Sequence, residues 1–415
     1  MRKLLLSLLL AASFSGVFAQ KLDDIQEKIE KKKFGEAKEK LDKVLADPKH
    51  QNNADAHFFK AVIHYNMSLE NPAELPVALE AMKKYFELEQ AKEESKRMLR
   101  STFEGHKTAF AIYSDYFRSG VKNFQEKKYL DAVTAFDGAI ASFELLSNNK
   151  LTDVKFDTTA NIYAGFAAQN AQKPELAVKY YDKLITNNIF DTTYLDAYRY
   201  MINYHLENTK DTAEALRYLQ INETAFPAYE DLWVDYEMGA MSPIREKKLA
   251  SYETLVKKYP NNFVAALNHG VELYNYTFFS DPKPANYVES QETTKAALER
   301  AIALNPGSHH ATYIMSQFYV NRIYDVEDSL RNVKGTTAAD VAKKKELNAR
   351  MDQHYENMYT YTQQAYDNFV KDEATLKAQD KANYRRVINQ MIDYYTRKKQ
   401  NDKVTFYQDK LKQLK

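Results

Sequence analysis

Apolar and small side chains recur along most of this chain with the spacing of helices that are buried on one side. In residues 116–140, Ala132, Phe136 and Ala139 are four and three residues apart, so they fall on one face of a helix. Gly120 lies twelve residues before Ala132, on a preceding helical segment, where a missing side chain lets two backbones approach closely. The pattern predicts two antiparallel helices joined by a short turn.

The same arrangement returns in the next stretch of sequence. Gly165 and Ala177 have the same twelve-residue interval, and Tyr181 stands where the first pair has Phe136. Pro174 falls just inside the start of the second helix, where its missing N–H costs little. Less regular pairs are predicted at residues 22–44, 54–97, 196–226, 233–260, 262–306, 309–370 and 381–414.

Two stretches interrupt the helical spacing. Pro282 and Pro284 rule out a continuous helix, so an irregular insertion is expected near residues 277–288. A polar stretch near residues 323–337 predicts a second irregular insertion. Because one helix pair is too small to fold alone, residues 20–415 are expected to form a single solenoid.

The small–small–aromatic arrangement resembles the tetratricopeptide repeat, a helix–turn–helix unit of about 34 residues. The string LERAIALNPGS at residues 298–308 is the most similar to the family, and Pro227 and Pro260 are 33 residues apart, close to one repeat. The resemblance implies an all-α fold, an α-solenoid of stacked antiparallel helix pairs wound into a right-handed superhelix. It also implies an interaction module.

In this family, several first-helix positions line a binding groove. The close-approach residues from which these positions are counted are Gly120, Gly165, Gly270 and Ser316. The resemblance implies that the groove positions are Phe117, Phe124, Phe166, Gln169, Tyr274, Asn275, His310, Tyr313, Gln317 and Asn321. This mixture of aromatics and amides suits a peptide, and a polysaccharide would also bind it. Tyr274 and Tyr313, beside the 277–288 insertion, are expected to be exposed anchors of that groove.

Residues 1–19 have the features of a signal peptide. Arg2 and Lys3 precede an apolar run over residues 4–12, and small residues stand before Gln20. A run of about nine residues is well short of the roughly 20 that span a bilayer. We expect cleavage before Gln20 and export of a soluble protein to the periplasm or the medium.

Charge and cysteine content exclude several classes of function. The chain has no cysteine, which excludes disulfides, thiolate metal sites, a cysteine nucleophile and a lipid-modified N-terminal cysteine. Two of the 58 basic residues lie in the leader, so the remaining 56 nearly balance 57 acidic residues. The two signs are interspersed, which leaves no basic face for nucleic acid.

Candidate catalytic and metal-binding chemistry is sparse. The motifs HExxH, GxxxxGK[ST], GxGxxG and GxSxG do not occur. Among nine histidines, the clusters are His309 with His310 and His57 with His64, whereas a zinc site needs at least three converging ligands. Most of the 31 tyrosines and 22 phenylalanines are expected to pack in the core. We therefore predict no catalytic residue, no cofactor and no metal.

The sequence favours a scaffold of a bacterial cell envelope that binds a protein or peptide partner on one face of the solenoid. The alternative is a glycan-binding or glycan-processing helical-repeat protein, which aromatic and amide side chains alone support. No enzymatic activity, nucleic-acid partner, integral membrane segment or lipid anchor is predicted for the mature chain.

Overall fold

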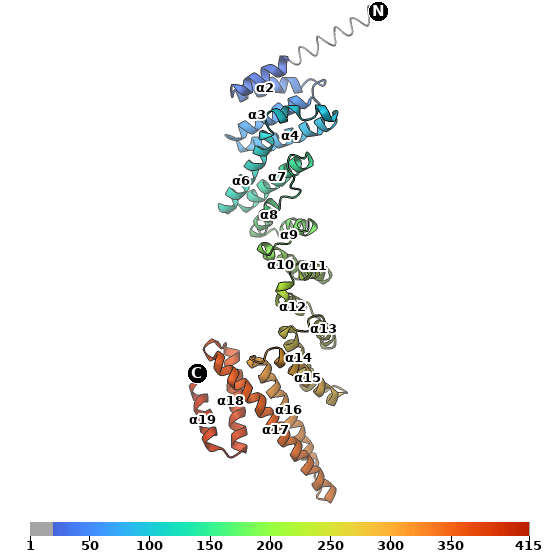
Figure 1. The fold of residues 1–415 in the computed structure, drawn as a ribbon, viewed down its shortest axis with the longest axis vertical. Coiled ribbons are helices and arrows are strands. Elements are labelled where there is room, and N and C mark those ends of the chain that lie inside the picture. The colour runs from blue at the N-terminus through green and yellow to red at the C-terminus, as the bar shows by residue number, and fades with distance from the viewer. Residues whose placement is uncertain (1–19, 415) are drawn as a thin grey trace, which may run out of the picture. The chain divides into compact units, whose positions relative to one another are not determined.

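The structure of this protein is a computed structural model that describes residues 20–414 (Figure 1). The predicted signal peptide, residues 1–19, lies outside the described residues. Residues 20–414 contain helices and no strand, which confirms the all-α prediction. None of the helices in this part of the chain has the length and apolar content required to cross a bilayer. The chain divides into two compact units, Met1–Tyr218 and Leu219–Lys415.

The first unit is a series of helices joined by short turns. After a helical segment over residues 20–30 come α2 (Phe34–Leu45), α3 (Ala54–Ser68), α4 (Leu75–Gln90), α5 (Leu99–Phe103), α6 (Lys107–Gln125), α7 (Tyr129–Asn148), α8 (Thr158–Asn170), α9 (Pro174–Thr186), α10 (Leu195–Asn203) and the beginning of α11 (Thr212–Ala225). Shorter helical turns lie at Pro72–Glu74, Glu94–Lys96, Thr192–Tyr194 and Tyr204–Thr209.

Glycines allow the paired helices of this unit to approach closely. A Cβ on Gly120 of α6 would lie 2.6 Å from Cε1 of Phe136 on α7. Along the same pair, Gly138 of α7 faces the ring of Tyr116 on α6. The later residue of α6 thus meets the earlier residue of α7, so the two helices are antiparallel. Gly165 faces Tyr181 across α8 and α9 in the same way, which confirms the predicted repeat of the pattern.

The second unit contains the end of α11 and eight further helices. These are α12 (Glu230–Gly239), α13 (Arg245–Lys258), α14 (Phe263–Phe279), α15 (Tyr287–Leu304), α16 (His309–Asn332), α17 (Ala338–Asp372), α18 (Ala378–Arg397) and α19 (Asn401–Gln413), with short turns at Pro227–Tyr229 and Glu373–Thr375. Trp233 of α12 is 1% exposed, and its Nε1–H donates to the carbonyl of Phe226 at 2.9 Å.

Polar side chains fix where several helices begin. Asn53, Asp157 and Asn262 each accept the backbone N–H three residues ahead at 2.9 Å, at the starts of α3, α8 and α14. Thr337 and Asp340 form a capping box at the start of α17. Such caps satisfy otherwise unpaired N–H groups and contribute about 1 kcal/mol each.

The last helices enclose a core rich in tyrosine. Phe318, Phe369 and Tyr384 are fully buried between α16, α17 and α18. The hydroxyls of Tyr359 on α17 and Tyr395 on α18 form a hydrogen bond of 2.8 Å. The prediction that most aromatic residues pack in the core holds for this cluster, in which the buried hydroxyl of Tyr384 has no hydrogen-bond partner within residues 20–414.

Both predicted insertions are shorter than expected. The prediction of an irregular 323–337 stretch is wrong over most of its length, because α16 continues to Asn332 with Ile323 and Val326 buried on its inner face. Within the predicted 277–288 insertion, Thr277 remains helical and fully buried, and its hydroxyl bonds that of Thr294 of α15 at 2.9 Å. Only residues 280–286 connect α14 to α15.

Candidate functional site

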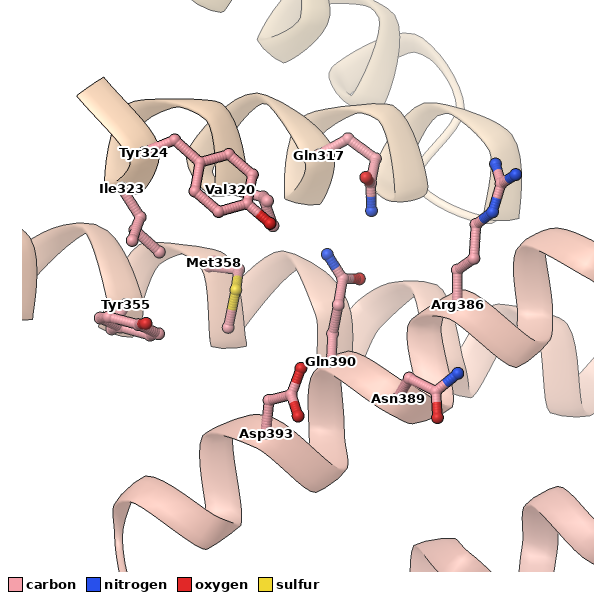
Figure 2. A pocket seen from close by; sticks show the side chains of 10 residues that line it. All are labelled: Gln317, Val320, Ile323, Tyr324, Tyr355, Met358, Arg386, Asn389, Gln390 and Asp393. Carbon is pink, nitrogen blue, oxygen red and sulfur yellow. The ribbon is translucent and has the colours of Figure 1, made fainter. Parts of the chain in front are cut away.

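A cleft of about 270 Å³ lies between α16, α17 and α18 in the second unit (Figure 2). Its walls come from three consecutive helices. The lining residues are Gln317, Val320, Ile323 and Tyr324 of α16, Tyr355 and Met358 of α17, and Arg386, Asn389, Gln390 and Asp393 of α18.

The two outer walls are the first helices of successive pairs, and they run parallel. Arg386 Nη1 donates to the hydroxyl of Tyr313 at 3.2 Å, and one turn later Ser316 Oγ donates to Gln390 Oε1 at 3.2 Å. Residue numbers rise together on α16 and α18, as they must when both helices start their pairs. These two bonds hold one end of the cleft together.

The polar residues of the cleft form one row on α18. Arg386, Asn389, Gln390 and Asp393 are spaced by three, one and three residues, so they share one helix face. Figure 2 shows Arg386 at one end of this row and Asp393 at the other, beside Met358. The row therefore carries a positive charge at one end, a negative charge at the other and two amides between them.

One donor in this row has no partner. The Nε2 of Gln390 is buried and makes no hydrogen bond within residues 20–414; its Oε1 lies 3.2 Å from Ser316 Oγ, whose hydroxyl also donates to the Tyr313 carbonyl at 2.8 Å. A buried donor without an acceptor costs about 1–3 kcal/mol. An acceptor supplied from outside the chain would remove this cost, so the site is suited to a ligand that carries a carbonyl or carboxylate oxygen.

The remaining walls are apolar, and the rim is aromatic. Ile323 and Met358 are each 3% exposed, whereas Tyr324 is 58% exposed. The guanidinium of Arg397 lies 4.3 Å from the ring centre of Tyr355. At the same end, burial of part of its side chain raises the pKa of the Asp393 carboxyl above its usual value.

The expectation that Tyr274 and Tyr313 are exposed anchors is wrong. Tyr274 is 7% exposed and its hydroxyl accepts from Asn321 Nδ2 at 2.8 Å, so both predicted residues serve the contact between α14 and α16. Tyr313 is 5% exposed because α18 covers it and Arg386 bonds its hydroxyl. The helix that buries Tyr313 comes about 70 residues later, beyond the reach of a local pattern.

The other predicted residues of this unit have separate surroundings. Gln317 lines the cleft. Asn275 and His310 are half-buried, and burial lowers the pKa of the His310 imidazole. The sequence reasoning missed the row on α18, because residues 381–414 were considered only as a helix pair. The signal that could have found the row is the spacing from Arg386 to Asp393 on one helix face.

In the first unit, the predicted aromatic residues gather around a tyrosine that the sequence reasoning missed. Tyr163 of α8 is 38% exposed, and its ring centre lies 6.5 Å from Phe117, 6.2 Å from Phe124 and 6.4 Å from Phe166. We call these four residues the Tyr163 cluster. Gln169, also predicted, is exposed on α8 and accepts from the hydroxyl of Tyr181 at 2.9 Å.

A group of ionisable side chains joins α11, α12 and α13. Lys258 Nζ lies 2.6 Å from carboxylate oxygens of both Glu223 and Glu237, and the Tyr259 hydroxyl donates to Glu237 at 3.1 Å. Burial, together with the neighbouring Glu237, raises the pKa of Glu223. Because one lysine already bridges both carboxylates, the arrangement acts as a tie between helices. Within residues 20–414, no group of three or more His, Asp or Glu side chains is placed to hold a metal ion.

Comparison with known proteins finds similarity at the level of structure. No protein-family model matches the sequence, and no curated protein sequence matches it. A tetratricopeptide-repeat protein of Bacteroides fragilis, BF2334, is 14% identical, over 66% of this chain and 97% of its own, with a TM-score of 0.26. The TPR2AB domain of yeast Sti1, solved in complex with pHSP90, is 14% identical, over 74% of this chain and 98% of its own, with a TM-score of 0.22. Naa15 in its complex with Naa10 and HypK is 14% identical, over 96% of this chain and 63% of its own, with a TM-score of 0.31.

The helix pairs of this chain themselves show the repeat. Gly120 and Gly165 occupy equivalent positions in two successive pairs, each against an aromatic ring of the second helix. Gly270 has the same place in α14, where a Cβ would lie 2.8 Å from Leu298 Cδ2 of α15. The chain has a tetratricopeptide-like fold of successive antiparallel helix pairs.

Proposed function

We propose that this protein is a non-catalytic interaction protein that binds a peptide segment of a partner protein in the cleft between α16, α17 and α18. The observation that carries the proposal is the buried Nε2 of Gln390, which lacks an acceptor beside an open cleft. Every residue of an extended peptide offers a carbonyl acceptor, and nearly every one offers an N–H donor. The amides of Gln317, Asn389 and Gln390 can both donate and accept, so they match such a ligand.

The apolar part of the cleft supports the same function. Val320, Ile323 and Met358 provide a surface against which a peptide side chain can be buried. Tyr324 at the rim is open to solvent and can cover that side chain once it is bound. A buried anchor surrounded by polar contacts is the usual distribution of binding energy at an interface.

The proposal includes export of the protein from the cytoplasm. The leader-like residues 1–19 support export to the periplasm or the medium, and the lack of cysteine supports a mature chain without a lipid anchor. The proposed partner is therefore a protein of the cell envelope or its surroundings.

A second candidate function is glycan binding at the Tyr163 cluster. Its support is the partly exposed ring of Tyr163, which stacks on Phe136 and lies edge to face with three further phenylalanines, and the exposed Gln169 further along α8. Apolar faces of sugar rings pack on such aromatic surfaces, and amides bond their hydroxyls.

A crosslinking experiment tests the two candidates. A photoreactive amino acid replaces Asn389 in the cleft or Gln169 on α8, the helix that carries Tyr163, and adducts from envelope extracts are identified by mass spectrometry. We expect peptide adducts at position 389, reduced at least tenfold by Gln390→Glu, which replaces the unpaired donor with an acceptor. Gln364→Ala on the exposed surface of α17 is the matched control. Glycan adducts at position 169 with none at position 389 would favour the second function and overturn the first.

A further inference from the structure

We infer, building on the peptide-binding function proposed above, that the cleft selects a lysine or arginine side chain of the bound peptide and pairs its cationic end with Asp393. The inference begins with the carboxylate of Asp393, which lacks a charged partner among the described residues. Asp393 forms no ion pair within the described part of the chain, although it lies beside the apolar side chain of Met358 (Figure 2). Its side chain is exposed and so open to a ligand, and partial burial raises the pKa of its carboxyl above the usual value.

The basic residues that follow Asp393 at the end of α18 are already engaged. Arg397 pairs with Asp352 at 2.6 Å, and Lys398 pairs with Glu356 at 2.5 Å. Both partners belong to α17, so these two bridges hold α18 against α17 one turn beyond Asp393. Neither of these two cations pairs with Asp393, so this exposed carboxylate is free to pair with a cation of the ligand.

The wall of the cleft fits the shape of a long basic side chain. Lysine and arginine bury a flexible hydrocarbon stem while the charged end stays in a polar place. Val320, Ile323 and Met358 offer the apolar path, and Asp393 stands beside it. The ring of Tyr324 stacks on no other ring among residues 20–414 and is 58% exposed, so one face is open to a cation.

The hydrogen-bond donors of the cleft fix the direction of the peptide. Arg386 and the Nε2 of Gln390 are donors, so they attract a carbonyl or carboxylate oxygen. A peptide that places its basic side chain at Asp393 therefore places an acceptor at Gln390. The reverse orientation would bring the basic side chain to Arg386, where like charges repel.

Four pools of hexapeptides test the inference. The pools share randomised flanks and differ at one central residue, which is lysine, arginine, norleucine or glutamate. Norleucine has an unbranched alkyl stem like that of lysine but no charge. We expect wild-type protein to bind the lysine and arginine pools at least tenfold more tightly than the norleucine pool, with a preference that weakens as salt rises.

Variants of Asp393 complete the test. Asp393→Asn should remove the preference for a basic centre, and Asp393→Arg should shift it toward glutamate. Asp402→Asn on the exposed start of α19 should leave the preference unchanged. If all pools bind wild type equally and Gln390→Glu weakens them all, the selection of a basic residue is overturned while the peptide-binding function stands. If no pool binds wild type, the peptide-binding function itself fails.

Discussion

Gly120 and Phe136 face each other across α6 and α7, so closely that a Cβ on the glycine would lie 2.6 Å from the phenylalanine ring. Phe136 is fully buried, and its ring is enclosed by the pair of helices that the glycine brings together. The pair therefore depends on the absence of a side chain at position 120.

Gly120→Ala should destabilise the first unit. Alanine favours a helix by about 1 kcal/mol over glycine, but overpacking a buried contact costs about 1–3 kcal/mol. We expect a net loss of about 1 kcal/mol in the free energy of unfolding, measured by urea denaturation. The matched control is Gly35→Ala in α2, where a Cβ meets nothing within 4 Å. Equal effects of the two substitutions would contradict the close approach.

Tyrosines of the second unit should separate into core and surface residues. Tyr274→Ala and Tyr313→Ala should each lower the free energy of unfolding by about 3–5 kcal/mol, because both rings are buried. Tyr324→Ala should change stability by less than about 0.5 kcal/mol, because that ring is exposed. The same exposed substitution should weaken peptide binding at least about tenfold. Thermal unfolding and titration with the bound peptide measure the two effects.

Acidification should destabilise the second unit through His354. Burial, together with the nearby charges of Arg322 and Arg350, lowers the pKa of this imidazole from 6.5 to about 4. Because the unfolded chain binds this proton first, stability falls as the pH drops from 6.5 toward 4. The loss reaches at most about 3 kcal/mol. His354→Gln should reduce the difference in stability between about pH 7 and about pH 4.5, and an unchanged pH profile would contradict the prediction.

Removal of Lys258 should make the free energy of unfolding fall as the pH rises, opposite to the effect of His354. Lys258→Met leaves the carboxyls of Glu223 and Glu237 side by side without a cation. The pKa of Glu223 is raised by burial, so its charged form is disfavoured in the folded state and the loss of stability grows as the pH rises above 4.5. We expect a loss of about 2 kcal/mol or more at about pH 8. The added substitution Glu223→Gln should recover part of this loss, and Lys257→Met, an exposed neighbour, should have little effect.

Export can be checked by the mass of the mature chain. If residues 1–19 are a signal peptide, the protein recovered from the periplasm or the medium should begin at Gln20. Intact-mass spectrometry measures this directly, and recovery of a chain that retains residues 1–19 would contradict the prediction.

The sequence predicts the local features of this fold better than its long-range contacts. The interval from Gly120 to Ala132 and its repeat from Gly165 to Ala177 are sufficient to predict two helix pairs, because each pair is built from neighbouring residues. Tyr313 was misplaced because α18 covers it from about 70 residues further along the chain. An exposed and a buried tyrosine have the same local spacing, so helical periodicity does not distinguish them.

In the candidate site, too, the sequence predicts local features better than long-range contacts. Gln317 was predicted from its distance to Ser316 within one helix, and it lines the cleft. Asp393 and Gln390 were missed because their importance arises from what they lack, a cation and an acceptor. Missing partners become visible only after three helices have packed together.

The position of Trp233 makes its fluorescence a local probe of α12. It is the one tryptophan in the chain, it is buried in α12, and its indole N–H is bonded to the carbonyl of Phe226. Its emission therefore reports the hydration of a single helix, whereas the emission of the 31 tyrosines is summed over both units. In one titration, the tryptophan signal can show whether a ligand loosens α12.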